Sequence, residues 1–367
     1  MSRGPLLLTL LFAIPACKGD KLPSQSTEDD EARTASAQRD RPPTAAGSAS
    51  APVPTPSATA PTPAVTGVPF AISATTVGNV KRRWQASIGG WGKEVALDAT
   101  GKLAAATSGA EVHLFDAVTG AAKGTIQSTC SIVDGGLALV ADKLVIACDH
   151  GIDLYDVATL TRAKSLAVRG AEATAASIDA THVALAHSDG VLALYPLDGG
   201  AAREIEVCGP PLAAAHLALS TDATRVAVGW PQGSIWVFAW ATPNEPLKIA
   251  KYDHAPNTLA LSADGRFLVE EGPSFGYAVW DLAESPAKKV YEPRSNESWT
   301  NGLAVSGDGK TVIAGTSSGY KVVIDGKTLK DLGDSHESIE ALAVDARGSA
   351  FIGVDRSGGV EMFSLTP

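Results

Sequence analysis

Few side chains in this chain have the type and spacing that catalysis needs. Residues 315–319 read Gly-Thr-Ser-Ser-Gly and match the G-x-S-x-G turn that exposes a nucleophilic serine. That turn lies between a strand and a helix, whereas strands are expected on both sides here, so we expect no nucleophile. His182 and His187 stand five residues apart on one expected strand. Because side chains alternate between the two faces of a strand, these histidines cannot share a metal ion.

The remaining ionisable groups form no reactive constellation either. Asp149 and His150 are adjacent and suit proton exchange, but they fall in an expected hairpin turn, where such a pair is solvated. No glycine-rich loop precedes a helix, as phosphate binding would need. The other histidines show no ligand spacing: His113, His216, His254 and His336. We therefore expect a protein that is not an enzyme and holds no metal or cofactor.

The elements that position these side chains are short strands in a repeated pattern. Each repeat has an apolar inner strand, a polar turn, a second strand, a glycine-bearing turn and a third strand. The third strands end at intervals of 39 to 44 residues, at Asp116, Asp156, Pro196, Ala239, Asp281, Asp325 and Ser364. Such a period predicts a β-propeller, in which each sheet needs its neighbours to bury its faces. The inner strands alternate alanine with branched residues, as in Val95-Ala96-Leu97, and predict a channel lined by small apolar groups.

The turns of these repeats point to a known family. Ser262-Ala263-Asp264-Gly265 and Ser306-Gly307-Asp308-Gly309 supply the side-chain acceptors and positive φ that tight hairpins demand. With the closing pair Trp280-Asp281, they resemble the WD-repeat family over about residues 79–367. The Gly-His dipeptide that opens the family's repeats is missing, although His254 and His336 stand near the place of its histidine. The resemblance implies an all-β, seven-bladed β-propeller of four-stranded antiparallel blades.

The first and last strands of this region are expected to pair. The last repeat leaves no room for an outer strand after Ser364, and residues 80–88 precede the first repeat as an extra strand. We expect this N-terminal strand to complete the seventh blade and close the ring, which removes an exposed sheet edge.

Three cysteines lie in the repeat region, at positions 130, 148 and 208. In the WD-repeat arrangement the loop that holds Cys130 lies beside the end of the strand that holds Cys148. A disulfide between them is one alternative, and two small buried thiols are the other. Cys208 is then left over, as inert packing or a reactive thiol.

The N-terminal segment indicates export. Residues 1–17 combine Arg3, an apolar run over Leu6–Ile14 and a final Cys17, and the run is too short to span a membrane. Ile14-Pro15-Ala16-Cys17 resembles the bacterial lipoprotein box. The resemblance implies an acylated Cys17 and an anchor in the outer membrane, on its periplasmic or surface face. An ordinary signal peptide with a chance cysteine is the alternative.

Residues 18–77 are rich in Ala, Pro, Ser and Thr and are expected to be a disordered tether, with the propeller over 78–367.

The expected partners follow from charge and loop composition. The net charge of −10 argues against nucleic acid, which requires clustered Lys and Arg, and a monomer is the default. One face of the expected propeller gathers aromatic and histidine side chains, as protein-recognition surfaces do. These candidate binding residues are Trp91, Trp230, His254, Phe275, Trp299 and His336. We expect a protein-binding platform or scaffold at the cell envelope. The alternatives are a structural subunit of an outer-membrane assembly complex and a propeller hydrolase or quinoprotein-like enzyme.

Overall fold

The computed structural model describes residues 70–207, 214–271, 276–292, 300–332 and 337–366. Within these ranges the chain is all β, apart from the short 3-10 helix η1 (Val77–Asn79). In this part of the chain no helix is long and apolar enough to cross a membrane. Cys17 and the other residues before Phe70 lie outside the described residues.

Most strands belong to four-stranded antiparallel sheets in which neighbours in sequence are neighbours in space. Alternation of apolar and polar residues, broken by tight turns, favours such meanders over parallel sheets. Four of these sheets are β2 (Gly92–Leu97), β3 (Leu103–Ser108), β4 (Glu111–Asp116), β5 (Ala122–Gln127); β14 (His216–Leu219), β15 (Arg225–Gly229), β16 (Ser234–Ala239), β17 (Leu247–Lys251); β18 (Leu259–Leu261), β19 (Phe267–Glu271), β20 (Tyr277–Asp281), β21 (Lys288–Tyr291); and β22 (Thr300–Val305), β23 (Thr311–Thr316), β24 (Gly319–Ile324), β25 (Lys327–Leu332).

Two further meanders join into one eight-stranded sheet. Their strands are β6 (Ile132–Val140), β7 (Lys143–Cys148), β8 (Gly151–Asp156), β9 (Thr161–Ala167), and β10 (Ala173–Ile178), β11 (His182–His187), β12 (Val191–Pro196), β13 (Arg203–Glu206). A parallel bridge between Ala175 of β10 and Asp134 of β6 links them. Asp134 therefore lies on the innermost strand of its meander, next to β10. Its side chain belongs to the site described below.

The remaining sheet joins the two ends of the described chain. Its order is β1 (Val80–Ser87), β28 (Gly359–Leu365), β27 (Ala350–Asp355) and β26 (Ile339–Val344). β1 pairs with β28 along its length, from Val80 opposite Leu365 to Ser87 opposite Gly359. The sequence prediction that residues 80–88 supply the outer strand of the last repeat is therefore confirmed.

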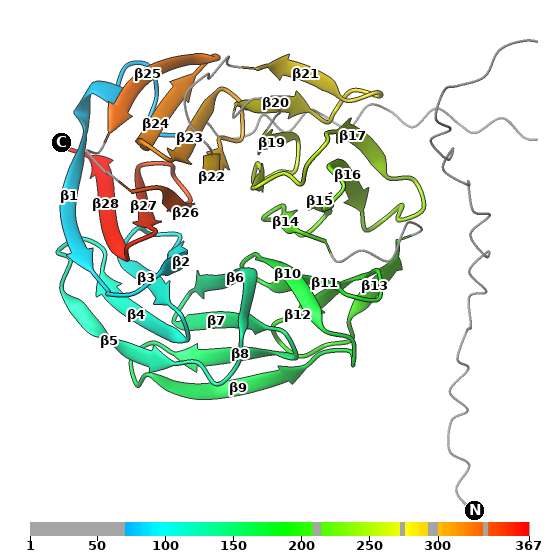
Figure 1. The fold of residues 1–367 in the computed structure, drawn as a ribbon, viewed down its shortest axis with the longest axis horizontal. Helices are drawn as coiled ribbons and strands as arrows, with labels where there is room; N and C mark the ends of the chain where they lie inside the picture. The colour runs from blue at the N-terminus through cyan, green and yellow to red at the C-terminus, as the bar shows by residue number, and fades with distance from the viewer. Residues whose placement is uncertain (1–69, 208–213, 272–275, 293–299, 333–336, 367) are drawn as a thin grey trace, which may run out of the picture. The chain divides into compact units, whose positions relative to one another are not determined.

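The first strand of each meander lies innermost, and the sheets are arranged around a common centre (Figure 1). These inner strands contact one another in succession: β2 contacts β6, β6 contacts β10, β10 contacts β14, β14 contacts β18, β18 contacts β22, β22 contacts β26, and β26 contacts β2. The hydrophobic core lies between neighbouring sheets. Between the β22–β25 sheet and the last sheet, Phe363 packs on Tyr320 and Phe351, with ring centroids 4.9 and 5.0 Å apart.

Side-chain acceptors hold the turns between first and second strands. Asp98 Oδ1 accepts hydrogen bonds from the Lys102 and Leu103 N–H groups at 2.6 and 2.7 Å. In the corresponding turn between β18 and β19, Ser262 Oγ donates to Asp264 Oδ1 at 2.7 Å and accepts the Phe267 N–H at 2.9 Å. These are the roles that the polar turn residues were predicted to have.

The packed structure begins before residue 78, so the predicted end of the tether was placed too late. Ile72 is fully buried and Val77 nearly so, both in the core cluster of the last sheet. The Ala71 and Ile72 N–H groups donate to the carbonyl oxygens of Arg347 and Gly348 at 2.8 and 3.0 Å. The composition of this segment resembles that of the tether, so it gave no sign of packing. A few apolar side chains and two backbone hydrogen bonds are enough to hold the segment against the last sheet.

Candidate functional site

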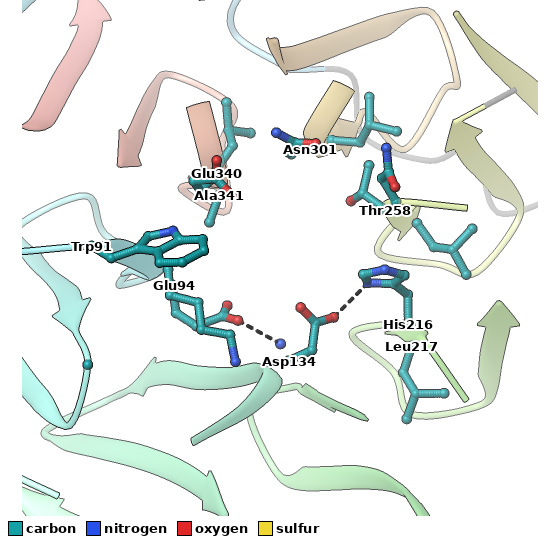
Figure 2. A pocket seen from close by; sticks show the side chains of 17 residues that line it. Trp91, Glu94, Asp134, His216, Leu217, Thr258, Asn301, Glu340 and Ala341 are labelled. Atoms are coloured by element: carbon teal, nitrogen blue, oxygen red, sulfur yellow. Dashed lines mark hydrogen bonds and ion pairs between the residues drawn. The ribbon is translucent and has the colours of Figure 1, made fainter. Parts of the chain in front are cut away.

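A cavity of about 620 Å³ opens where the inner strands begin. Its wall is built from residues of most of the sheets, including Lys93 and Glu94 of β2, Asp134 of β6, His216 of β14, and Asn301 and Glu340 of β22 and β26. Figure 2 shows the Glu94 and Asp134 carboxyl groups on one side, His216 beside Asp134, and Asn301 and Glu340 across the cavity. The cavity therefore gathers polar groups that lie far apart in sequence.

The polar side chains reach the cavity because the inner strands bulge there. The pairing of β2 with β3 skips residues 93–94, that of β22 with β23 skips Asn301, and that of β26 with β27 skips Glu340. The pairing of β6 with β7 likewise skips residues 133–136, which include Asp134. A bulge leaves a residue outside the ladder and redirects its side chain. These strand ends thus hold polar groups where regular pairing would bury apolar ones.

Glu94, Asp134 and His216 form the most ordered part of the wall. The Gly135 N–H donates to Glu94 Oε1 at 3.1 Å, and the Glu94 N–H donates to Thr107 Oγ1 at 2.9 Å. His216 Nδ1 lies 2.6 Å from Asp134 Oδ2. Because an ionised carboxylate only accepts hydrogen bonds, Nδ1 carries the proton, and Nε2 of a neutral imidazole keeps its lone pair.

The local backbone at Gly135 makes this arrangement possible. Gly135 has φ of 68°, a left-handed conformation that L side chains rarely adopt. A Cβ at this position would collide with the carbonyl oxygen of Ala176 in the neighbouring meander. Glycine therefore lets the chain approach β10 and aim its N–H at Glu94.

Burial controls the charge of these carboxyl groups. Glu94 is only 8 % exposed, and burial, together with the nearby Asp134 carboxylate, raises its pKa from 4.5 to about 8. Lys93 and the Gly135 N–H act in the opposite direction. Burial also raises the pKa of Glu340. At neutral pH this burial favours the protonated form of Glu94.

Trp91 stands at the edge of this cavity and is 58 % exposed, the most exposed of the large hydrophobic side chains in the described ranges. The Arg356 guanidinium lies over its ring, 4.8 Å from the centroid. This is the one predicted binding residue that the structure brings to the cavity wall among those it describes. His254 is exposed, with its ring stacked on Tyr252 at 6.4 Å.

Trp230 does not belong to the surface that the sequence predicted. It is 6 % exposed and packs edge-to-face against Trp236, with centroids 6.5 Å apart. Its loop position suggested exposure, but the tight turn before β16 folds the ring back onto the core, so this prediction was wrong. Phe275, Trp299 and His336 lie outside the described residues, as does Cys208.

Cys130 and Cys148 are joined by a disulfide, with Cα atoms 5.8 Å apart. The bond connects the segment that enters β6 to the end of β7, so it fastens the bulged end of β6 to its neighbour. Asp134 lies in that bulge, and the disulfide thereby supports one wall of the cavity.

The catalytic patterns considered from the sequence lie away from the cavity. Ser317 is in the hairpin turn between β23 and β24, as predicted, and not at a strand-to-helix turn. His187 is buried, with Nδ1 2.9 Å from the Ala171 carbonyl oxygen, and burial lowers its pKa. The His150 side chain is 70 % exposed, 3.9 Å from the Asp149 carboxylate.

The sequence prediction of a channel lined only by small apolar groups was wrong at this end. It missed Glu94, Asp134, His216 and Glu340 as site residues. A signal was present, because the residue before an apolar triplet is Glu94 in the first repeat and His216 in the fourth.

No protein-family model matches this chain, and no curated protein matches it significantly.

Proposed function

We propose that this chain is a membrane-anchored, non-catalytic platform that binds a protein partner at the bacterial cell envelope. The observation that carries the proposal is the exposed Trp91 beside a polar cavity at the centre of the sheets. A large exposed aromatic ring next to a concave site is the typical anchor of a protein-recognition surface.

The scaffold of this platform, in our proposal, is a closed seven-bladed β-propeller similar to WD-repeat proteins. The succession of inner-strand contacts that returns from β26 to β2 supports closure. The pairing of β1 with β28 supports it as well, because a strand from the start of the region then completes the last sheet. Such a ring leaves no long sheet edge free for aggregation.

The anchor is a lipid on Cys17, and the segment between Cys17 and Phe70 is the tether. The Ile14-Pro15-Ala16-Cys17 sequence after a short apolar run supports this assignment. The folded part begins with Ala71 and Ile72, shortly before η1 and β1. Membrane attachment would hold the cavity face within reach of partners in the same compartment.

Site-specific photo-crosslinking in native envelopes tests the platform. A photoreactive amino acid replaces Trp91 in one chain and Val118 in another; Val118 is 49 % exposed and follows β4 at the opposite end of the same sheet. We expect a defined protein adduct from position 91 and none from position 118. Equal labelling from both positions, or labelling from neither, would refute the proposal.

A hydrolase is the second candidate, because the Asp134–His216 pair has the geometry of an oriented general base. Asp134 fixes the imidazole through Nδ1 at 2.6 Å, which leaves Nε2 able to take a proton from water. A panel of ester and lactone substrates would test this alternative with wild type and His216→Ala. Turnover that disappears in His216→Ala would favour the hydrolase over the platform.

A further inference from the structure

We propose that the cavity is a recognition site for one basic side chain, lysine or arginine, of the protein partner. The inference rests on the proposed function, because a protein presents the cation. It deepens that function by naming the chemical group that the cavity accepts and the residues that hold it.

The balance of charged groups in the cavity wall favours a cation. Three carboxyl groups line it, those of Glu94, Asp134 and Glu340, against the ammonium group of Lys93. Lys93 Nζ donates to the Ile132 carbonyl oxygen at 3.2 Å, so this cation is already engaged at the wall. An entering ammonium or guanidinium group would be attracted to the Asp134 carboxylate and would favour the ionised form of Glu94.

Glu94 supplies the most specific evidence. Its side chain is nine-tenths buried, and its Oε1 accepts the Gly135 N–H. Its Oε2 has no hydrogen-bond partner among the residues that the structure describes, although the group lines the cavity. Because Oε2 lies at the cavity and makes no hydrogen bond within the described ranges, a donor group of a bound ligand could reach it.

Other groups suit the same ligand. Asn301 donates both amide hydrogens away from the cavity, to Ser338 Oγ at 2.9 Å and the Ile339 carbonyl oxygen at 3.0 Å. Its own carbonyl oxygen is therefore left as an acceptor at the wall. The Trp91 ring already carries the Arg356 guanidinium at 4.8 Å, which demonstrates that the electron-rich ring accommodates cations at the cavity edge.

Binding of a cation must be linked to proton release. A positive charge beside Glu94 favours its carboxylate, whereas the empty site favours the protonated acid. The charged and titratable groups that face Glu94 are Asp134, His216, Lys93 and Glu340, and deprotonation of any of them also favours a cation. Affinity should therefore rise by up to about tenfold per pH unit between pH 6 and 8.

Calorimetry on the purified chain tests the inference without the partner. The probes are Nα-acetyl-arginine amide and Nα-acetyl-lysine amide, with the uncharged Nα-acetyl-citrulline amide as the matched neutral ligand. We expect saturable binding of a basic probe and no binding of citrulline amide. The observed binding enthalpy should vary linearly with the ionisation enthalpy of the buffer, with the slope that proton release requires. Glu94→Gln keeps the shape and the acceptor for Gly135, and should weaken binding about tenfold to a hundredfold, the effect of one charge-assisted hydrogen bond.

Control variants make the result specific. Glu245→Gln removes an exposed carboxylate from the turn between β16 and β17 and should leave binding unchanged. Thermal melts of both variants verify that they fold. Equal binding of citrulline amide, absence of binding by both basic probes, or equal weakening in the two variants would overturn the inference, as would a stoichiometric divalent cation in the cavity.

The two proposals fail in different ways. If a partner crosslinks from position 91 but neither basic probe binds, the platform stands and the basic-side-chain site is wrong. If a basic probe binds with the Glu94 dependence but no protein crosslinks, the cavity binds cations and the platform is wrong.

Discussion

Replacing Glu94 by glutamine should stabilise the protein at alkaline pH and have little effect at acidic pH. The folded chain holds the Glu94 proton up to a pKa of about 8, whereas the unfolded chain releases it near 4.5. Between these values the unfolded state binds fewer protons than the folded state, so the free energy of unfolding falls as pH rises. Glutamine cannot ionise, so the free energy of unfolding of the variant should not fall with pH for this reason.

The magnitude follows from the width of that pH window. Each pH unit over which one proton differs between the states changes the free energy of unfolding by about 1.4 kcal/mol. The window from 4.5 to about 8 therefore has an upper limit of about 5 kcal/mol at pH 8.5. Because relaxation and water penetration reduce the cost of a buried charge, we expect about 3 kcal/mol of this in practice.

The assay is urea unfolding of wild type and Glu94→Gln at pH 5 and pH 8.5, with Glu245→Gln as the exposed control. The difference between Glu94→Gln and wild type should be below about 1 kcal/mol at pH 5 and about 3 kcal/mol at pH 8.5. Carboxyl groups distant from the two substituted positions have the same surroundings in all three proteins, so their contributions cancel in the comparison.

A Glu94→Gln variant that is equally or less stable than wild type at pH 8.5 would refute the reasoning. It would mean that the Glu94 carboxylate is already compensated, for example by Lys93, and does not need a ligand. The expected result would show a residue that reduces stability while it lines a cavity, which is typical of binding sites.

Three further predictions address the scaffold and the anchor. Deletion of residues 79–88 removes β1 and exposes the edge of β28, so the melting temperature should fall by many degrees; an unchanged melt would contradict closure. Cys130→Ser with Cys148→Ser opens a link between residues 18 apart, and urea unfolding should report a loss of about 3 kcal/mol; no loss would mean that the bond constrains little. Cys17→Ser should move the protein from the membrane to the soluble fraction; retention in the membrane would argue against a lipid anchor.

The strands could be predicted because their signals are local. Alanine between branched residues, followed by Ser-x-Asp-Gly turns, specifies a strand and its hairpin within a dozen residues. The pairing of β1 with β28 followed from counting the strands of each repeat. Only the β1–β28 pairing joins distant segments, and it needed no more than the number of strands in each repeat.

The candidate site could not be predicted, because it depends on contacts between distant segments. Asp134 and His216 are 82 residues apart in sequence, and they meet only after three meanders are in place. The bulges that turn Glu94, Asn301 and Glu340 toward the cavity depend on pairing register, which short motifs do not reveal. Trp230 illustrates the same limit, since its loop position gave no sign that the ring folds inward.

The central claim is that the Trp91 face binds a protein through a basic side chain held by Glu94. The most direct measurement is the crosslinking yield from position 91 in native envelopes, compared between chains with and without Glu94→Gln. We predict one protein adduct that Glu94→Gln reduces at least about tenfold and Glu245→Gln leaves unchanged. An adduct that forms equally well in both variants, or no adduct from position 91, would contradict the account.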